Sequence, residues 1–259
     1  MTSKLTLIEK KDGVGIITLN RPAKLNALNS ALTQEIHKAL TDFEEADDVK
    51  VVIMTGAGER AFCAGGDIYE EAVLSKEKYI TSEDFNRWHG GVDNFWHVAN
   101  FKKPTICALN GLAYGGGAYL AAAFDIRIGC DRSSFRFIAV KAGLVNGTWT
   151  LPMIVGLPIT KEILFTGKVI NAEESYRIGL LNHLVSAAEV MPASIDMARE
   201  IAGNYQSAVR GLKDILTGNI GMGLNEMYNN EKQTVIRSVT MPNPKDSFAG
   251  FLKSHEKKI

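Results

Sequence analysis

One run of β-branched residues constrains the fold more than any other feature of the chain. It covers residues 49–55 and ends at Gly56-Ala57-Gly58. Such a run is typical of a strand buried on both faces, as in a parallel sheet covered by helices. Pro104–Leu109 and Asp125–Cys130 repeat the pattern, and the first of them leads into a glycine turn and a helix beginning near Gly117. Strands that alternate with helices predict an α/β fold.

The N-terminal segment predicts a hairpin followed by a helix. Lys4–Lys10 and Val14–Leu19 read as strands on either side of a turn at Lys11-Asp12-Gly13. Apolar residues at helical spacing then predict a helix that Ser30 caps and that runs to about Ala46.

Two further regions are predicted to be mainly helical. We expect residues 69–100 to be mostly helical. After Pro192 three helical segments follow with no strand between them, at 193–204, 208–217 and 224–239. We therefore divide the chain into a core of residues 1–192, which carries the site, and a helical C-terminal module of residues 193–259.

Charge and cysteine content narrow the possible functions. The 29 basic residues cancel 29 acidic ones, which removes the broad attraction on which most nucleic-acid binders depend. No apolar run approaches the ~18 residues of a membrane span, and the N-terminus lacks a signal-peptide pattern. The three cysteines lie in apolar stretches and read as reduced core residues, and no metal-ligating motif is present. We expect a cytoplasmic protein that binds no nucleic acid, membrane or dedicated metal.

Two glycine-rich loops are the main functional signal. Phe62–Ile68 and Asn110–Gly117 each follow a buried strand and precede helical sequence. Free N–H groups at a helix start favour negative charge, so two such loops on adjacent strands can direct two donors at one oxygen and form an oxyanion hole. The alternative is that the glycines only permit tight helix–strand packing. Neither loop matches the dinucleotide or phosphate-loop pattern.

The order of motifs along nearly the whole chain resembles the crotonase (enoyl-CoA hydratase/isomerase) superfamily. The segments that carry the resemblance are Asn20–Leu28, Phe62–Ile68, Asn110–Gly117, Asp125–Ile128, Phe165–Gly167 and Gly179–Asn182. It implies an α/β crotonase-like fold of repeated ββα units with a helical C-terminal trimerisation region. It also implies an enzyme of acyl-CoA thioesters, with lyase or isomerase activity and a place in fatty acid metabolism. Such an enzyme assembles as a homotrimer or a dimer of trimers and needs no cofactor beyond the CoA of its substrate.

The resemblance also assigns site residues. By it, the N–H groups of Gly66 and Gly116 hold the thioester oxygen as it gains enolate charge. Asp67 has a plainer alternative as a helix cap, and the basic pair usual in the family near the C-terminus is replaced by Ser254-His255. The residues expected to contact the CoA moiety are Lys24, Leu25, Ala64, Asp67, Ile68 and Phe251.

The chain departs from the family where hydratases keep two catalytic glutamates and where other members use an aspartate. Tyr119 and Ala139 stand in the glutamate positions, and Gly147 in the aspartate position, within a loop about three residues shorter than usual. Because the carboxylate pair activates water, we expect weak hydration. Isomerisation, decarboxylation and carbon–carbon hydrolysis remain as reactions that an enolate-stabilising site supports without that pair. Tyr119 is the leading proton donor or substrate-orienting hydroxyl, and its alternative role is to fill the acyl pocket.

Other functions stay open at this point. A non-catalytic CoA-ligand binding protein has no need of carboxylates, and a hydrolase of β-diketones that carry no CoA belongs to the same superfamily. His89 and His97 are weaker acid–base candidates on the expected helical stretch. A screen of turnover against enoyl-CoA, malonyl-type CoA and β-diketone substrates would distinguish these functions, because each function predicts a different substrate or none.

Overall fold

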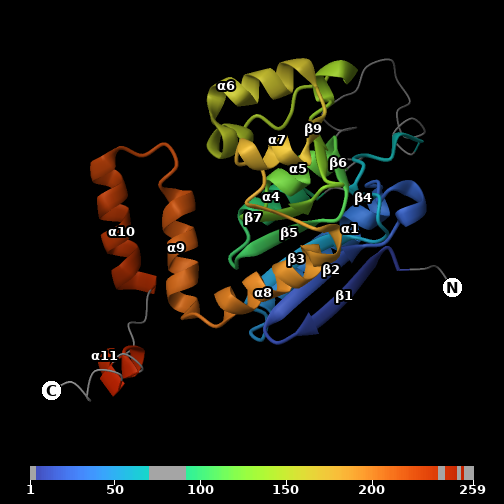
Figure 1. Cartoon of the computed structure of the whole chain (residues 1–259). Helices are drawn as coiled ribbons and strands as arrows, with labels where there is room; N and C mark the ends of the chain where they lie inside the picture. The colour runs from blue at the N-terminus through green and yellow to red at the C-terminus, as the bar shows by residue number, and fades with distance from the viewer. Residues whose placement is uncertain (1–3, 70–91, 239–242, 250–251, 254–259) are drawn as a thin grey trace. The chain divides into compact units, whose positions relative to one another are not determined.

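The computed structural model describes residues 4–69, 92–238, 243–249 and 252–253 (Figure 1). The chain forms two compact units, Met1–Gly203 and Asn204–Ile259. The first unit is α/β, as the alternating pattern predicts, and the second is helical in its described residues.

A six-stranded sheet lies at the centre of the first unit, in the order β1-β2-β3-β5-β7-β10. The predicted N-terminal hairpin is confirmed: β1 and β2 pair antiparallel around a turn with positive φ at Asp12 and Gly13. The other neighbouring strands pair in parallel. The strands are β1 (Thr6–Lys11), β2 (Val14–Leu19), β3 (Val51–Gly56), β5 (Thr105–Leu109), β7 (Ile126–Cys130) and β10 (His183–Val185).

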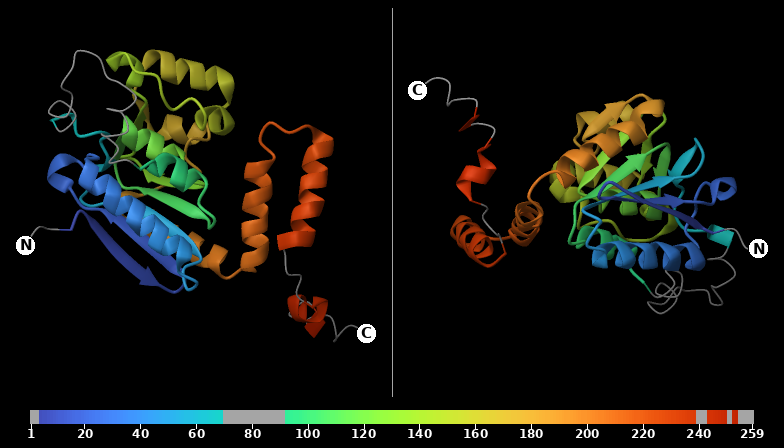
Figure 2. Two further views of the ribbon diagram at one scale, coloured as in Figure 1. Left: turned by 180° about the vertical axis from the view of Figure 1, so that it is seen from behind. Right: turned by 90° about the horizontal axis from the view of Figure 1, so that it is seen from below.

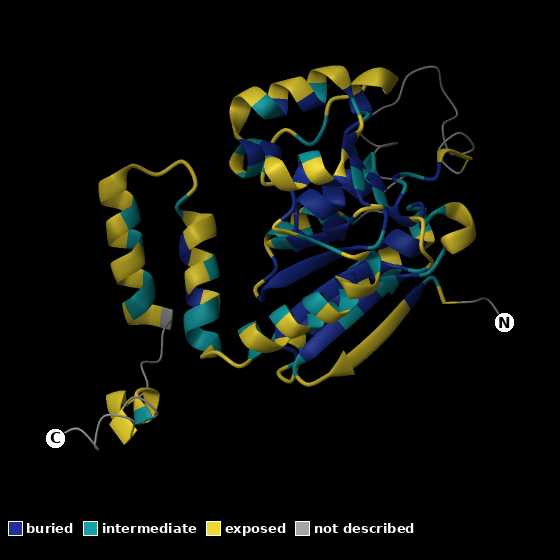
Figure 3. Ribbon diagram, in the orientation of Figure 1, coloured by how far each residue is buried: buried dark blue, intermediate teal, exposed yellow. Residues whose placement is uncertain are grey.

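The β-branched run at residues 49–55 becomes the middle of this sheet. Every residue of β3 and of β5 is buried, whereas β1 is exposed after its first residue (Figure 3). Because side chains alternate along a strand, Val52 and Met54 pack in one apolar cluster, and Val51 and Ile53 pack in another on the opposite face. The two clusters lie under different helices, so the strand is buried on both faces as predicted.

Helices α1 (Ser30–Glu45) and α8 (Val190–Ala202) supply those two clusters (Figure 2). The predicted start of α1 is one residue late. Asn29 is the cap, because its backbone is extended and its side chain accepts a hydrogen bond from Leu32 N at 2.9 Å. Ser30 is the first helical residue. An Asn or Ser side chain can serve at this position, and the backbone conformation of Asn29 decides between the two.

A second, four-stranded sheet positions the glycine loops. It has the order β4-β6-β8-β9, and β4 pairs in parallel with β6. Since the carboxyl ends of parallel strands lie at the same edge of a sheet, the loops that leave β4 and β6 become neighbours. The strands are β4 (Ala61–Cys63), β6 (Leu112–Tyr114), β8 (Ser134–Arg136) and β9 (Ile170–Asn171).

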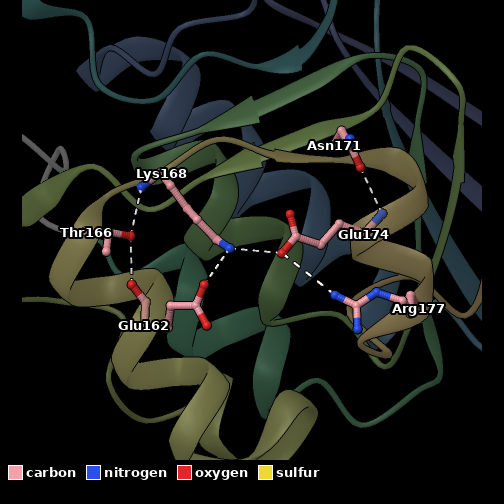
Figure 4. A network of polar contacts seen from close by, with 6 residues as sticks. All are labelled: Glu162, Thr166, Lys168, Asn171, Glu174 and Arg177. Atoms are coloured by element: carbon pink, nitrogen blue, oxygen red, sulfur yellow. Dashed lines mark hydrogen bonds and ion pairs between the residues drawn. The ribbon is translucent and has the colours of Figure 1, made fainter.

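Four more α-helices and three 3-10 turns are described in the first unit. The stretch 69–100 is predicted to be mostly helical, and the structure describes residue 69 and residues 92–100 of it. Helix α4 lies in the second of these ranges. A polar network joins α6 to α7: Lys168 Nζ lies 2.7 Å from a Glu162 oxygen and 2.9 Å from one of Glu174 (Figure 4). The helices are α4 (Asn94–Ala99), α5 (Gly116–Ala122), α6 (Leu151–Thr166) and α7 (Ala172–Arg177), with 3-10 turns η1 (Pro22–Lys24), η2 (Ala139–Ala142) and η3 (Ala187–Glu189).

The second unit contains α9 (Gln206–Gly218), α10 (Leu224–Ser238) and α11 (Pro244–Ser247). Helices α9 and α10 pack against each other, and each carries large exposed apolar side chains, among them Leu216 and Ile236. None of the helices in the described ranges combines the length with the hydrophobicity that crossing a bilayer demands.

Candidate active site

The two glycine loops approach each other backbone to backbone. Gly65 has a φ of +98°, and a Cβ placed on it would lie 2.7 Å from Tyr114 O and 3.1 Å from Gly116 N. Gly115 has a φ of +48°, and a Cβ on Gly117 would overlap the carbonyl oxygen of Cys63. Glycine suits such conformations and such a close approach best. The close approach explains Gly65 and Gly117, and the backbone conformation, with φ 48° and ψ −124°, explains Gly115.

Packing does not explain Gly116. A Cβ there would make ordinary contacts, 3.4 Å from Leu28 Cδ1 and 3.7 Å from both Gly65 Cα and Gly66 N. Gly116 is the first residue of α5, so its N–H has no acceptor within the helix.

The N–H of Gly66 is also unpaired within the described residues. Gly66 forms a parallel bridge with Leu28, in which Leu28 N donates to Gly65 O at 2.7 Å and Asp67 N donates to Leu28 O at 2.8 Å. In a parallel ladder the N–H of the intervening residue points to the other side. Neither Gly66 nor Gly116 donates its N–H to an acceptor in the described parts of the chain. Two donors thus remain available near one point.

Both glycines line a pocket of about 220 Å³. Its walls come from the two loops, from α1 and α4, and from the 3-10 turn at residues 139–142. Most of the lining is apolar, and the polar side chains in it are Thr33, Tyr119 and Asn146. Among the described lining residues there is no carboxylate, imidazole or ammonium group. The described parts of the chain also hold no group of three or more metal-ligating side chains.

Tyr119 projects from α5 and is the largest polar side chain of the pocket. Its ring packs at 5.3 Å from the ring of Phe137, and the residue is 7% exposed. Burial raises the pKa of Tyr119 to about 12, against a small opposing effect from the nearby backbone N–H of Ala139. The hydroxyl is nevertheless inaccessible and has no hydrogen-bond partner among the described residues, and the same holds for Asn146 Oδ1. A buried polar atom without a protein partner can bind an ordered water or a polar group of a ligand.

The other two positions that lack carboxylates lie beside Tyr119. Ala139 is buried and lines the pocket. Gly147, with a φ of +73°, faces the Tyr119 ring so closely that a Cβ would overlap it. Tyr119, Ala139 and Gly147, the three positions where the sequence comparison expects carboxylates, therefore lie together at one side of the pocket.

The structure separates the predicted CoA contacts into groups. Ala64 and Ile68 line the pocket, and Lys24, Leu25 and Asp67 do not. Lys24 is exposed, with Nζ 5.2 Å from the centre of the Tyr69 ring. Asp67 forms an ion pair with Arg21 at 2.9 Å.

Several predicted residues lie away from the pocket or cannot be placed. Phe251 and His89 lie outside the described residues. His97 is described, but it contacts His37, with 3.1 Å between their Nδ1 atoms, and does not line the pocket.

Some residues of the site carried no recognisable signal in the sequence. Phe95 of α4 and Thr33 of α1 line the pocket, yet each reads as an ordinary residue of an amphipathic helix. Asn26 and Arg21 belong to a motif that the sequence singled out, but nothing there indicated that their side chains hold the loop of Gly66. These contacts arise between segments that are distant in the chain.

Comparison with known proteins finds similar sequences and similar solved structures along nearly the whole chain. A sequence model described as enoyl-CoA hydratase/isomerase matches residues 9–258. The short-chain-enoyl-CoA hydratase of Clostridium acetobutylicum is 32% identical over 253 residues, covering 96% of this chain and 95% of that protein. The carnitinyl-CoA dehydratase of Proteus mirabilis is 35% identical, covering 85% and 83%. The crystal structure of an enoyl-CoA hydratase from Bacillus anthracis superposes with a TM-score of 0.88 at 30% identity, covering 97% of each chain.

Proposed function

The chain belongs to the enoyl-CoA hydratase/isomerase family of crotonase-fold acyl-CoA enzymes, and we propose that it stabilises a thioester enolate without acting as a hydratase. The observation that carries the proposal is the pocket itself. Two unpaired N–H groups, from Gly66 and Gly116, meet at a cavity whose described lining contains no carboxylate. Two donors directed at one oxygen stabilise negative charge as it develops there.

The absence of a base in the described lining favours one of the three remaining reactions. Isomerisation begins with removal of a proton, and carbon–carbon hydrolysis needs an activated water, so both require a base. Tyr119 is protonated at neutral pH because burial raises its pKa to about 12. It can donate a proton but cannot accept one. Decarboxylation of a β-carboxy thioester requires no base.

The proposed reaction is the decarboxylation of a β-carboxy thioester through its enolate. The bond between Cα and the carboxylate breaks, carbon dioxide leaves, and the electron pair passes into the thioester to form its enolate. The N–H groups of Gly66 and Gly116 hold the enolate oxygen. A proton from Tyr119 or from solvent then restores Cα–H. The largely apolar lining also disfavours the charged carboxylate of the substrate relative to neutral carbon dioxide.

A substrate panel tests the reaction. Malonyl-CoA, methylmalonyl-CoA, crotonyl-CoA and an uncharged β-diketone are each incubated with the protein, and products are followed by mass spectrometry. We expect loss of carbon dioxide from a malonyl-type thioester. Turnover of the diketone alone would instead indicate the β-diketone hydrolase. Binding of acetyl-CoA or free CoA in calorimetry with no turnover at all would indicate a non-catalytic CoA-ligand binding protein.

A pair of substitutions at Gly116 tests the oxyanion hole. Gly116→Pro removes the N–H, and proline is tolerated at the first position of a helix. Gly116→Ala adds the same Cβ and keeps the N–H, so it is the matched control. We expect Gly116→Pro to lose a further ~10²–10³-fold in turnover relative to Gly116→Ala, the usual cost of one oxyanion donor. Equal turnover by the two variants, with both folded by circular dichroism, would remove this N–H from the mechanism.

Assembly, cofactor use and location remain parts of the proposal. The exposed apolar side chains of α9 and α10 support a homotrimer or a dimer of trimers, because such surfaces are usually covered by another protein. Light scattering after gel filtration tests this with an expected mass of three or six chains. Activity of the dialysed protein without added cofactor tests the expectation that CoA in the substrate suffices. The cytoplasm and fatty acid metabolism are the proposed setting.

A further inference from the structure

The N–H of Gly66 is oriented by a segment that lies well before it in the sequence. Ala64 N donates to Leu25 O at 3.0 Å, and the two bonds around Leu28 extend this contact through Asp67. The donor loop therefore docks as a short parallel strand on residues 25–28. Any shift of that segment moves the peptide that carries the Gly66 N–H.

A largely buried ion pair fastens the two segments together. Arg21 Nη2 lies 2.9 Å from Asp67 Oδ2, and the side chains are 15% and 11% exposed. The other terminal nitrogen of Arg21 donates to Ala27 O. A guanidinium that holds a carboxylate and a carbonyl at once fixes both angle and distance. Because Asp67 directly follows Gly66 in the chain, the ion pair also restrains the peptide that carries the Gly66 N–H.

Asn26 ties the same segment to the strands beneath it. It is fully buried, with a φ of +55°. Its side chain accepts from Arg21 N at 3.0 Å and donates to Ala57 O at 3.0 Å and to Ala61 O at 2.9 Å. Asparagine tolerates the left-handed conformation better than most residues. The segment is thus anchored at β4, the strand that leads into the loop of Gly66.

We propose that Arg21 and Asp67 are positioning residues for the Gly66 oxyanion donor. Their ion pair holds the donor loop against residues 25–28, so that the Gly66 N–H points into the pocket beside that of Gly116. This assigns Asp67 a role different from the CoA contact expected from the sequence. The inference rests on the proposed function, because it concerns the donor that the function requires.

The probe for this inference is acetoacetyl-CoA, whose enolate absorbs in the near ultraviolet. Stabilisation of the enolate by the two N–H groups lowers the pH at which the bound ligand ionises. We expect Asp67→Asn to raise that pH by about one to two units and to lower turnover ~10–100-fold, because misplacement of a catalytic group by about 1 Å has an effect of this size. Binding of free CoA should change little. A merely structural role would leave the ionisation of the bound ligand unchanged.

The control is another ion pair that lies on the surface. Lys10 and Asp48 lie 2.7 Å apart, with side chains 44% and 65% exposed, so Asp48→Asn should alter neither ionisation nor turnover. If Asp67→Asn fails to fold, Arg21→Lys serves instead, because it keeps the charge but loses the two-pronged geometry. An unchanged ionisation of bound acetoacetyl-CoA in a folded Asp67→Asn or Arg21→Lys variant would overturn the inference.

The same probe separates this inference from the proposed function. If Gly116→Pro shifts the ionisation relative to Gly116→Ala and Asp67→Asn does not, the oxyanion hole stands and only the positioning role fails. If Gly116→Pro causes no shift relative to Gly116→Ala, the oxyanion hole itself fails.

Discussion

The ring of Tyr119 occupies the space that a side chain at residue 147 would need. A Cβ on Gly147 would overlap Tyr119 Cδ1 and Cε1 and would lie 3.0 Å from Cζ. A tyrosine in this orientation on α5 thus depends on a glycine in the loop after η2. The residues at 119 and 147 are physically linked, because in the present arrangement the tyrosine ring excludes any side chain from position 147.

The first prediction concerns this contact. Gly147→Ala should destabilise the protein by ~1–3 kcal/mol more than Gly143→Ala, since the added methyl overpacks against the ring. Gly143 is the matched control: its φ is +71°, close to the +73° of Gly147, and a Cβ there has open space. Each variant places a side chain at a similar positive φ, which costs about 1–2 kcal/mol, so the comparison of the two reduces this contribution. Urea unfolding measures the difference, and equal destabilisation of the two variants would show that the ring moves aside freely.

The second prediction concerns the hydroxyl of Tyr119. Tyr119→Phe keeps the ring and should lower turnover ~10²–10⁴-fold with little change in binding, if the hydroxyl donates a proton or orients the substrate. Tyr114→Phe is the control, because Tyr114 does not line the pocket and its hydroxyl contacts Ser134 Oγ at 3.4 Å. Near-normal turnover by Tyr119→Phe would leave the ring as a plain wall of the acyl pocket. Tyr119→Ala would then weaken binding through lost apolar contact.

The third prediction follows from the raised pKa of Tyr119, about 12 against an ordinary value of 10.0. The unfolded chain ionises this group at lower pH than the folded chain. Its contribution to stability is therefore fully present below pH ~10 and is lost as pH rises through ~12. Wild type should lose more stability than Tyr119→Phe across this range in urea unfolding. Ultraviolet titration should also show one late-ionising tyrosine that the variant lacks; identical titrations would contradict the assignment.

The fourth prediction concerns hydration of crotonyl-CoA. With Tyr119 and Ala139 in place of two carboxylates, turnover should be at least ~10³-fold below that of an ordinary hydratase, since each missing acid–base group typically costs ~10²–10⁴. Loss of the enoyl absorbance, measured beside a hydratase with both glutamates, gives the comparison. Hydration at the rate of that enzyme would show that a residue outside the described pocket lining supplies the base.

The sequence by itself determined the fold class and the location of the donor loops. The run at 49–55 is buried on both faces because a strand covered by helices on each side must be apolar throughout, and such a run is visible without any structure. The alternation of residues 4–10, followed by the turn at Lys11-Asp12-Gly13, likewise predicts the hairpin. The glycine loops around Gly66 and Gly116 are visible in the sequence because glycine at a strand-to-helix turn reflects a local backbone requirement, and the resemblance of motifs along the whole chain indicated the family.

Only the tertiary structure decided how the site is assembled. The parallel pairing of β4 with β6 makes neighbours of two loops that are about fifty residues apart, and no local pattern encodes that pairing. The contact of Tyr119 with Gly147 and the ion pair of Arg21 with Asp67 likewise join distant segments. Sequence patterns report the periodicity of burial along one segment, whereas these contacts depend on the packing of several segments at once. For that physical reason, the sequence predicted which positions lack carboxylates, and only the structure showed that Tyr119 lies against Gly147 and that Arg21 holds Asp67.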